Sequence, residues 1–392
     1  MDVFEPARLG ALTLRNRVIK AATYEGMSPG GVASTALIDH HRRLAQGGVG
    51  LSTVAYCAIS DAGRTFEDQL RLVPESRAAL RELARGVHAD GGRVALQLSH
   101  AGTFSKVRGE GGRAPRGPSL AWNSYGLSAG VPVARAMSDD EIHETVDAFG
   151  RAAAVAAELG FDAVEIHLGH GYLLSQFLSP ATNRREDDWG GSIENRMRLP
   201  LAVLERVRRE VGGGVAILAK TNLADGFAGG LEIDEAVEVA RAIERAGHVD
   251  LLVPSGGFTS KSPFYLLRGG LPVAKMAAAQ KDPLARLAMR WIGGAILDRY
   301  DFEESFFLPL ARRLRGALTM PVALLGGLVS RASLATAREE GFDFVVLGRA
   351  LIADPDLVVR MQRGEVDRSR CNACNECVAE MDRGGVRCVL PS

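Results

Sequence analysis

Residues 139–168 read DDEIHETVDAFGRAAAVAAELGFDAVEIHL, and this stretch decides the fold. Its first part, residues 139–160, repeats apolar residues with the period of an amphipathic helix and ends on glycine, which commonly terminates helices. The largely apolar, β-branched run that follows, residues 163–168, is typical of a buried strand. A helix that leads directly into such a strand predicts a parallel sheet covered by helices.

The same pattern recurs along the chain. Three more helical segments follow a capping residue and close on glycine, at residues 193–212, 234–247 and 330–341. Eight apolar runs alternate with helical segments, at residues 18–23, 49–55, 93–99, 163–168, 215–221, 249–254, 321–325 and 342–347. Eight such units favour an α/β fold of the (β/α)8 TIM-barrel type over an open doubly wound sheet.

Two long segments interrupt this alternation, at residues 101–137 and 258–315. Both follow strands, so we expect them on the catalytic face, where the carboxyl ends of barrel strands meet. The second segment contains Trp291, Tyr300 and Phe302, and we expect it to form a helical subdomain that also serves as a lid. We therefore predict a barrel over residues 1–365 and a short cysteine-rich tail over residues 366–392.

The composition points to a small molecule as the expected partner. The chain has 392 residues, with 47 Lys and Arg against 47 Asp and Glu, so its net formal charge is zero. This balance lacks the basic surface of a protein that binds nucleic acid or a membrane surface. The start, MDVFEPARLG, lacks a basic stretch followed by a long apolar one, so we expect a cytoplasmic protein.

Polar and glycine residues stand at the ends of the predicted strands, where barrel chemistry takes place. Gln97 stands near the end of the third strand, and Lys220 near the end of the fifth. The last two strands end in Gly326-Gly327 and Gly348-Arg349. Glycine N–H groups beside an arginine fork are typical of a phosphate site, although tight turns alone would also explain the glycines.

The fourth strand runs into His167, His170 and Tyr172, a set with three interpretations. Two histidines can begin a zinc site, but a third ligand is missing from the motif. Both imidazoles can instead donate hydrogen bonds to a substrate oxygen while the tyrosine acts as a general acid. The third interpretation is burial as satisfied polar groups.

The tail carries four of the five cysteines in the spacing C-x2-C-x2-C-x10-C, at Cys371, Cys374, Cys377 and Cys388. Four thiolates at such spacing can hold a 4Fe-4S cluster or zinc, and unmetallated thiols are the third alternative. We interpret the fifth, Cys57, as a small buried residue.

Six segments together resemble a known family: FEPARLGALTLRNRVIKAAT, GGVGLSTVAYCAISDAGR, VALQLSHAG, EIHLGHGYLLSQFLSPATNRREDDWGGSIENRMRL, LLGG and VVLGRALIADPDL. The chain resembles the Old Yellow Enzyme superfamily of FMN-dependent NADH:flavin oxidoreductases, in particular the barrel portion of bacterial 2,4-dienoyl-CoA reductases. The resemblance covers essentially the whole chain and implies FMN as cofactor, with NAD(P)H as electron donor.

The resemblance also implies roles for single residues. His167 and His170 would bind the carbonyl or nitro oxygen of an activated alkene, and Tyr172 would protonate its α carbon. One pocket would serve NAD(P)H and substrate in turn, which gives an ene-reductase with ping-pong kinetics. FMN would be bound by Ala22, Thr23, Tyr24, Tyr56, Gln97, Lys220, Gly326, Gly327, Gly348 and Arg349.

The chain departs from the family pattern at Tyr24, where relatives carry Cys, Thr or His, and at Lys220, where they carry Arg. A lysine offers a point charge in place of a planar fork. One alternative function is an FMN and iron-sulfur amine dehydrogenase (demethylase) that passes electrons through the tail to an external acceptor. Another is a flavin-binding redox sensor without turnover. By analogy with relatives, we expect a homo-oligomer.

Overall fold

The computed structural model describes residues 2–280 and 283–391 of the chain and shows a closed parallel barrel. The hydrogen-bonded order of its strands is β11-β10-β9-β5-β4-β3-β13-β12, and every neighbouring pair is parallel. A parallel bridge between Leu252 and Val322 joins the two outer strands and closes the ring. The strands are β3 (Val18–Lys20), β4 (Leu51–Ala58), β5 (Arg93–Ser99), β9 (Ala163–Leu168), β10 (Ala216–Asn222), β11 (Leu251–Ser255), β12 (Ala323–Leu325) and β13 (Phe344–Leu347).

The barrel prediction is confirmed, since each of the eight expected apolar runs contains or overlaps one of these strands. The strands are buried along their whole length, apart from the partly buried first residue of β5. Burial on both faces explains why their sequences are mostly apolar.

Helices cover the outside of the barrel. The helix α3 begins where predicted because Ser138 and Glu141 form a capping box, each side chain accepting a hydrogen bond from the other's backbone N–H. A short antiparallel hairpin, β1 (Ala7–Leu9) with β2 (Leu12–Leu14), precedes the barrel. The covering helices are α1 (Thr35–Gln46), α2 (Pro74–Ala89), α3 (Asp139–Glu158), α5 (Ile193–Val211), α6 (Ile233–Ala246), α10 (Leu308–Gly316), α11 (Arg331–Glu339), α12 (Arg349–Ala353) and α13 (Leu357–Gln362).

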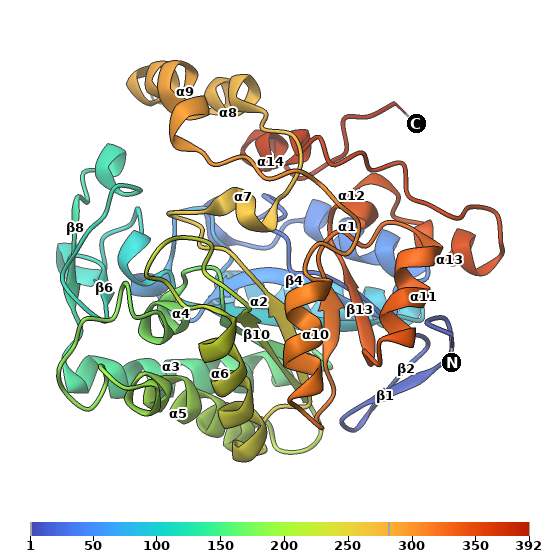
Figure 1. Ribbon diagram of the computed structural model, residues 1–392, viewed down its shortest axis with the longest axis horizontal. Coiled ribbons are helices and arrows are strands. Elements are labelled where there is room, and N and C mark those ends of the chain that lie inside the picture. The colour runs from blue at the N-terminus through green and yellow to red at the C-terminus, as the bar shows by residue number, and fades with distance from the viewer. Residues whose placement is uncertain (1, 281–282, 392) are drawn as a thin grey trace.

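The first long segment folds into a small sheet of β6 (Arg116–Gly117), β8 (Val133–Ala136) and β7 (Ala121–Trp122). The second contains α7 (Pro263–Leu266), α8 (Val273–Ala279) and α9 (Pro283–Ile296), followed by α10 beside α6. Trp291 on α9 is 74% exposed, whereas Phe306 is buried. In Figure 1 helices α7, α8 and α9 lie above the strands together with α14 (Glu376–Glu380) of the tail.

The tail packs onto the catalytic face. Lys275 of α8 forms an ion pair with Glu376 of α14, and the N–H of Val386 donates to the carbonyl oxygen of Glu25. Among the helices described, none is long and apolar enough to cross a bilayer.

Candidate active site

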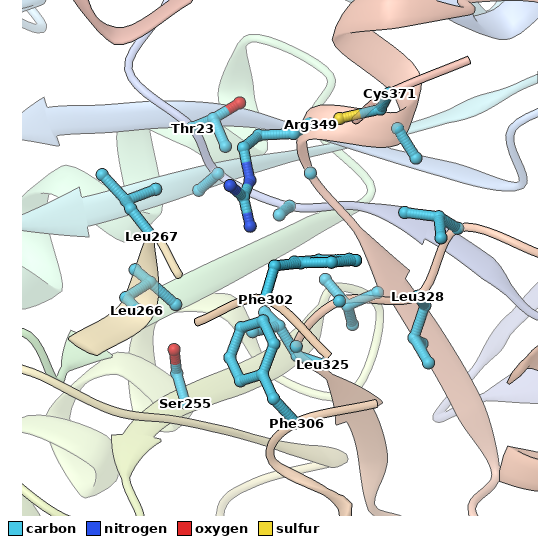
Figure 2. A pocket seen from close by; sticks show the side chains of 18 of the residues that line it. Thr23, Ser255, Leu266, Leu267, Phe302, Phe306, Leu325, Leu328, Arg349 and Cys371 are labelled. Carbon is cyan, nitrogen blue, oxygen red and sulfur yellow. The ribbon is translucent and has the colours of Figure 1, made fainter. Parts of the chain in front are cut away.

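A cavity of about 670 Å³ lies at the carboxyl ends of the barrel strands and is called the large cavity here. Figure 2 shows the Arg349 side chain reaching into it between Thr23 and Phe302. Residues that line it include Ala22, Thr23, His170, Lys220, Ser255, Phe302, Phe306, Gly326, Gly327, Gly348, Arg349 and Cys371.

Gly326 and Gly327 are required by the backbone at the end of β12. Their φ angles are +115° and +75°, which side chains rarely tolerate. A Cβ on Gly326 would lie 2.7 Å from the Phe307 ring, and one on Gly327 would lie 2.8 Å from the carbonyl oxygen of Glu303. The turn is therefore tight, as one interpretation of these glycines expects. Both glycines also line the large cavity, as the phosphate-site interpretation expects.

Arg349 lies at the start of α12 and is held by two distant segments. Its Nη1 donates to the carbonyl oxygen of Arg268 at 2.8 Å and to the Oδ1 of Asn375 in the tail. The guanidinium lies 5.7 Å from the centre of the Phe302 ring. Arg349 thus links the large cavity to the cysteine tail, a link that sequence reasoning did not foresee.

Lys220 and Gln97 meet inside the barrel at a residue that sequence reasoning missed. The Oε1 of Glu165 accepts hydrogen bonds from Lys220 Nζ and from Gln97 Nε2, both at 2.7 Å. All three residues are about 99% buried. The sequence held one signal for Glu165. It stands two residues before His167, and because successive residues of a strand alternate faces, the two side chains lie on the same face.

His167 and His170 come together because the chain bends sharply after β9. His170 has a φ of +57°, and its N–H donates to the Oδ1 of Asn222 at 3.0 Å. The ring centres of the two histidines are 5.0 Å apart, and that of Tyr172 is 4.4 Å from that of His167. The His170 Nε2 lies 2.7 Å from the Oγ of Ser255 on β11.

Burial fixes the protonation of this group. Burial, together with His170 and Lys220, holds the pKa of His167 well below its ordinary value. Burial also lowers the pKa of His170 to about 3 and raises that of the Tyr172 phenol above its ordinary value. Both imidazoles are therefore neutral near pH 7, and the phenol carries its proton.

Tyr24 and Tyr56 lie beside the large cavity in an aromatic cluster with Tyr172. The ring centre of Tyr56 is 5.2 Å from that of Tyr172 and 5.6 Å from that of Tyr24. Ala22, which lines the large cavity, packs against the same cluster. The cluster comprises Tyr24, Tyr56, Phe66, Phe104, Tyr125 and Tyr172.

Lys106 borders this cluster. Its Nζ lies 4.2 Å from the centre of the Tyr125 ring, and its side chain is half-buried. Burial lowers the pKa of Lys106, while the charge of Asp382 in the tail raises it. Lys106 comes from the first long segment, in which sequence reasoning found no site residue.

The four tail cysteines line a second cavity of about 280 Å³, called the cysteine cavity here. Arg349 and Cys371 line both cavities. None of the five cysteines, all of which the structure describes, forms a disulfide, and burial raises the pKa of Cys57, in line with its predicted buried position. Within the described part of the chain, no three His, Cys, Asp or Glu side chains are already arranged as a metal site.

Two buried polar atoms near the large cavity fit a bound cofactor and substrate. Thr23 Oγ1 and His167 Nδ1 have no hydrogen-bond partner among the described residues. Buried polar groups are normally paired, so these two atoms are available to hydrogen-bond a bound ligand. The cationic Lys220, the glycine turns and these atoms together fit FMN, which carries a phosphate and a polar ring.

The comparisons agree with this assignment. A model of the NADH:flavin oxidoreductase / NADH oxidase family matches residues 2–252. A 4,4'-dithiodibutanoate disulfide reductase of Rhodococcus erythropolis is 42% identical over 391 residues, which cover 99% of this chain and 95% of that protein.

Two solved structures extend the likeness. A 2-naphthoyl-CoA reductase in complex with 2-naphthoyl-CoA is 26% identical with a TM-score of 0.81, and the match covers 98% of this chain but 56% of that longer one. An old yellow enzyme homologue from Zymomonas mobilis superposes with a TM-score of 0.72 at 23% identity, covering 95% of this chain and 96% of that one. This second likeness supports the barrel fold.

Proposed function

The chain belongs to the NADH:flavin oxidoreductase / NADH oxidase family, and from this premise we propose that it is an FMN-dependent ene-reductase. Its substrates would be alkenes activated by a conjugated carbonyl or similar group, and NAD(P)H would supply the hydride. The observation that carries the proposal is the close approach of Tyr172 to His167, whose tilted rings have their centres 4.4 Å apart, with both groups buried and neutral.

The three side chains support alkene reduction in distinct ways. The unpartnered Nδ1 of His167 and the imidazole of His170 bind the substrate oxygen and draw electron density from the β carbon. Tyr172 holds the proton that the α carbon needs, because its raised pKa keeps the phenol protonated. Ser255 orients His170 from the neighbouring β11.

FMN, when bound, supplies the hydride chemistry that no side chain can perform. We propose that Thr23, Lys220 and Arg349 hold it in the large cavity with the glycine turns, and that Gln97 contacts its ring. NAD(P)H and substrate would use the same site in turn, which gives ping-pong kinetics.

The test is Tyr172→Phe, studied by rapid mixing of each half-reaction. Oxidation of the reduced enzyme by 2-cyclohexenone should slow by about 10²-fold or more, the contribution expected of a general acid. Reduction of the flavin by NAD(P)H should change by less than about tenfold. Equal effects on both half-reactions would overturn the role of Tyr172.

A second candidate is the reduction of small disulfides that carry carboxylates, favoured by the 42% identical disulfide reductase and by Lys106. Two electrons from NAD(P)H would pass through FMN to the S–S bond, which breaks to give two thiols with protons from Tyr172 and solvent. Turnover of 4,4'-dithiodibutanoate compared with 2-cyclohexenone, at equal NADH, decides between the two candidates. A clear preference for the disulfide would replace the alkene as substrate.

We also propose that Cys371, Cys374, Cys377 and Cys388 hold a 4Fe-4S cluster, supported by the cavity that all four line. The measurement is an absorption spectrum of anaerobically purified protein with iron and zinc assays. About four irons per chain are expected for the cluster. Zinc alone, or neither metal, would overturn it and also weaken the alternative of an amine dehydrogenase that exports electrons through the tail.

A further inference from the structure

One carboxylate, Glu165, joins two of the residues expected to contact FMN. Glu165 lies on β9 directly opposite Gln97 of β5 in the strand register. Its Oε1 accepts from Gln97 Nε2 and from Lys220 Nζ of β10, each at 2.7 Å. Three neighbouring strands are thereby connected at a single buried oxygen atom.

This arrangement restricts both partners. The amide of Gln97 is turned so that its NH2 group faces Glu165, which leaves the carbonyl oxygen as the end available to a ring N–H. Lys220 is one of the residues that line the large cavity, and its ammonium is fixed and counterbalanced by the carboxylate. The positive charge that FMN would experience is therefore smaller than that of an unpaired lysine.

The chain contains a second buried pair that serves as a control. Lys20 forms an ion pair with Glu25, and both residues are as deeply buried as the Lys220 pair. Lys20 Nζ also donates to the carbonyl oxygen of Thr53 at 3.0 Å, and Glu25 accepts from the N–H of Ala55 at 3.2 Å. Lys220 lines the large cavity, whereas Lys20 and Glu25 do not, although the charge of Lys20 also acts on those of Lys220 and Glu165.

We propose that Glu165 is a positioning residue that sets both the affinity for FMN and its reduction potential, through Gln97 and Lys220. A cation beside the flavin favours the reduced, more negatively charged form. By pairing with Lys220, Glu165 limits this effect and keeps the reduced cofactor a strong hydride donor. The inference rests on FMN binding but not on the identity of the substrate.

The experiment compares Glu165→Gln with Glu25→Gln. Both remove one buried carboxylate from a lysine pair, so thermal unfolding should show both proteins destabilised. In Glu165→Gln, the midpoint potential of bound FMN should shift positive, equivalent to about tenfold stronger preference for reduced over oxidised FMN, and the shift in Glu25→Gln should be clearly smaller. Its oxidised FMN should also bind about tenfold more weakly, because the Gln97 amide is no longer fixed.

Two results would overturn the proposal: an unchanged potential in Glu165→Gln, or an equal shift in Glu25→Gln. If Glu165→Gln does not fold, the double variant Glu165→Gln with Lys220→Met restores the charge balance and is measured against Lys220→Met alone. Lys220→Met alone should shift the midpoint potential of bound FMN negative. An unchanged potential in this variant would overturn the role of the Lys220–Glu165 pair in setting the potential. Potential and FMN affinity are measured without substrate, so a failure of alkene reduction leaves this test intact.

Discussion

His170 Nε2 and Ser255 Oγ lie 2.7 Å apart, and this contact joins the loop after β9 to the end of β11 inside the large cavity. His170 has a left-handed backbone and a partly buried ring, and the contact with Ser255 orients that ring.

Ser255→Ala should therefore slow substrate reduction. The loss of one hydrogen bond corresponds to about tenfold in the oxidative half-reaction, with a smaller effect on flavin reduction by NAD(P)H. Rapid-mixing kinetics of both half-reactions measure this difference. Ser255→Thr, which retains the hydroxyl, is the control, and an unaffected oxidative rate in Ser255→Ala would contradict the orienting role.

Lys106→Met should weaken the use of carboxylate substrates. Its ammonium is half-buried beside the aromatic cluster, where a substrate carboxylate would be partly desolvated. We expect KM for 4,4'-dithiodibutanoate to rise about tenfold, the cost of a hydrogen bond to a charged group, while KM for its dimethyl ester stays unchanged. Lys106→Arg should retain most of the affinity. Parallel increases for acid and ester would show that Lys106 acts through packing.

Stability should fall as the pH drops below about 6.5, the ordinary pKa of histidine. Burial lowers the pKa of five histidines, so the unfolded chain binds more protons than the folded chain in this window. Each such histidine removes up to about 1.4 kcal/mol of unfolding free energy per pH unit. They are His40, His41, His100, His167 and His170.

Urea unfolding at constant ionic strength and pH 8, 6.5 and 5.5 measures this effect. The midpoint should fall modestly from pH 8 to pH 6.5, where the unfolded histidines are half protonated, and much further from pH 6.5 to pH 5.5. A midpoint that rises or stays constant at pH 5.5 would mean that these imidazoles can protonate in the folded protein.

Asn375→Ala should reduce FMN affinity from outside the cavity. Asn375 is buried, accepts a hydrogen bond from Arg349, and donates to the carbonyl oxygens of Leu267 and Gly270. Without it Arg349 loses one of its anchors, and we expect about tenfold weaker FMN binding. Fluorescence titration measures this, with the exposed Asn372→Ala in the same tail as control. Equal affinities in both variants would show that the tail does not hold Arg349.

The barrel was predictable because its strands are buried on both faces, so their sequences stand out as apolar runs. β5 and β9 agree with the expected bounds at both ends. β3 is shorter than expected and ends at Lys20. The residues after it bend away, and Ala21, Ala22 and Thr23 line the large cavity instead of continuing the sheet.

The site was predictable only where its residues stand at strand ends. Glu165 was missed because it lies within an apolar strand, and a strand pattern gives no sign of which polar partner lies opposite. Arg349 is oriented by Arg268 and Asn375, which lie 81 and 26 residues away from it in the chain. Such pairings are set by tertiary packing, which local sequence does not encode.

The wall that Arg349 and Cys371 share between the two cavities has a practical consequence for preparing the enzyme. Because a ligand in either cavity would contact this wall, we expect the occupancy of the two cavities to be coupled. If the tail binds the proposed cluster, recombinant protein made under iron limitation should also be isolated with less flavin.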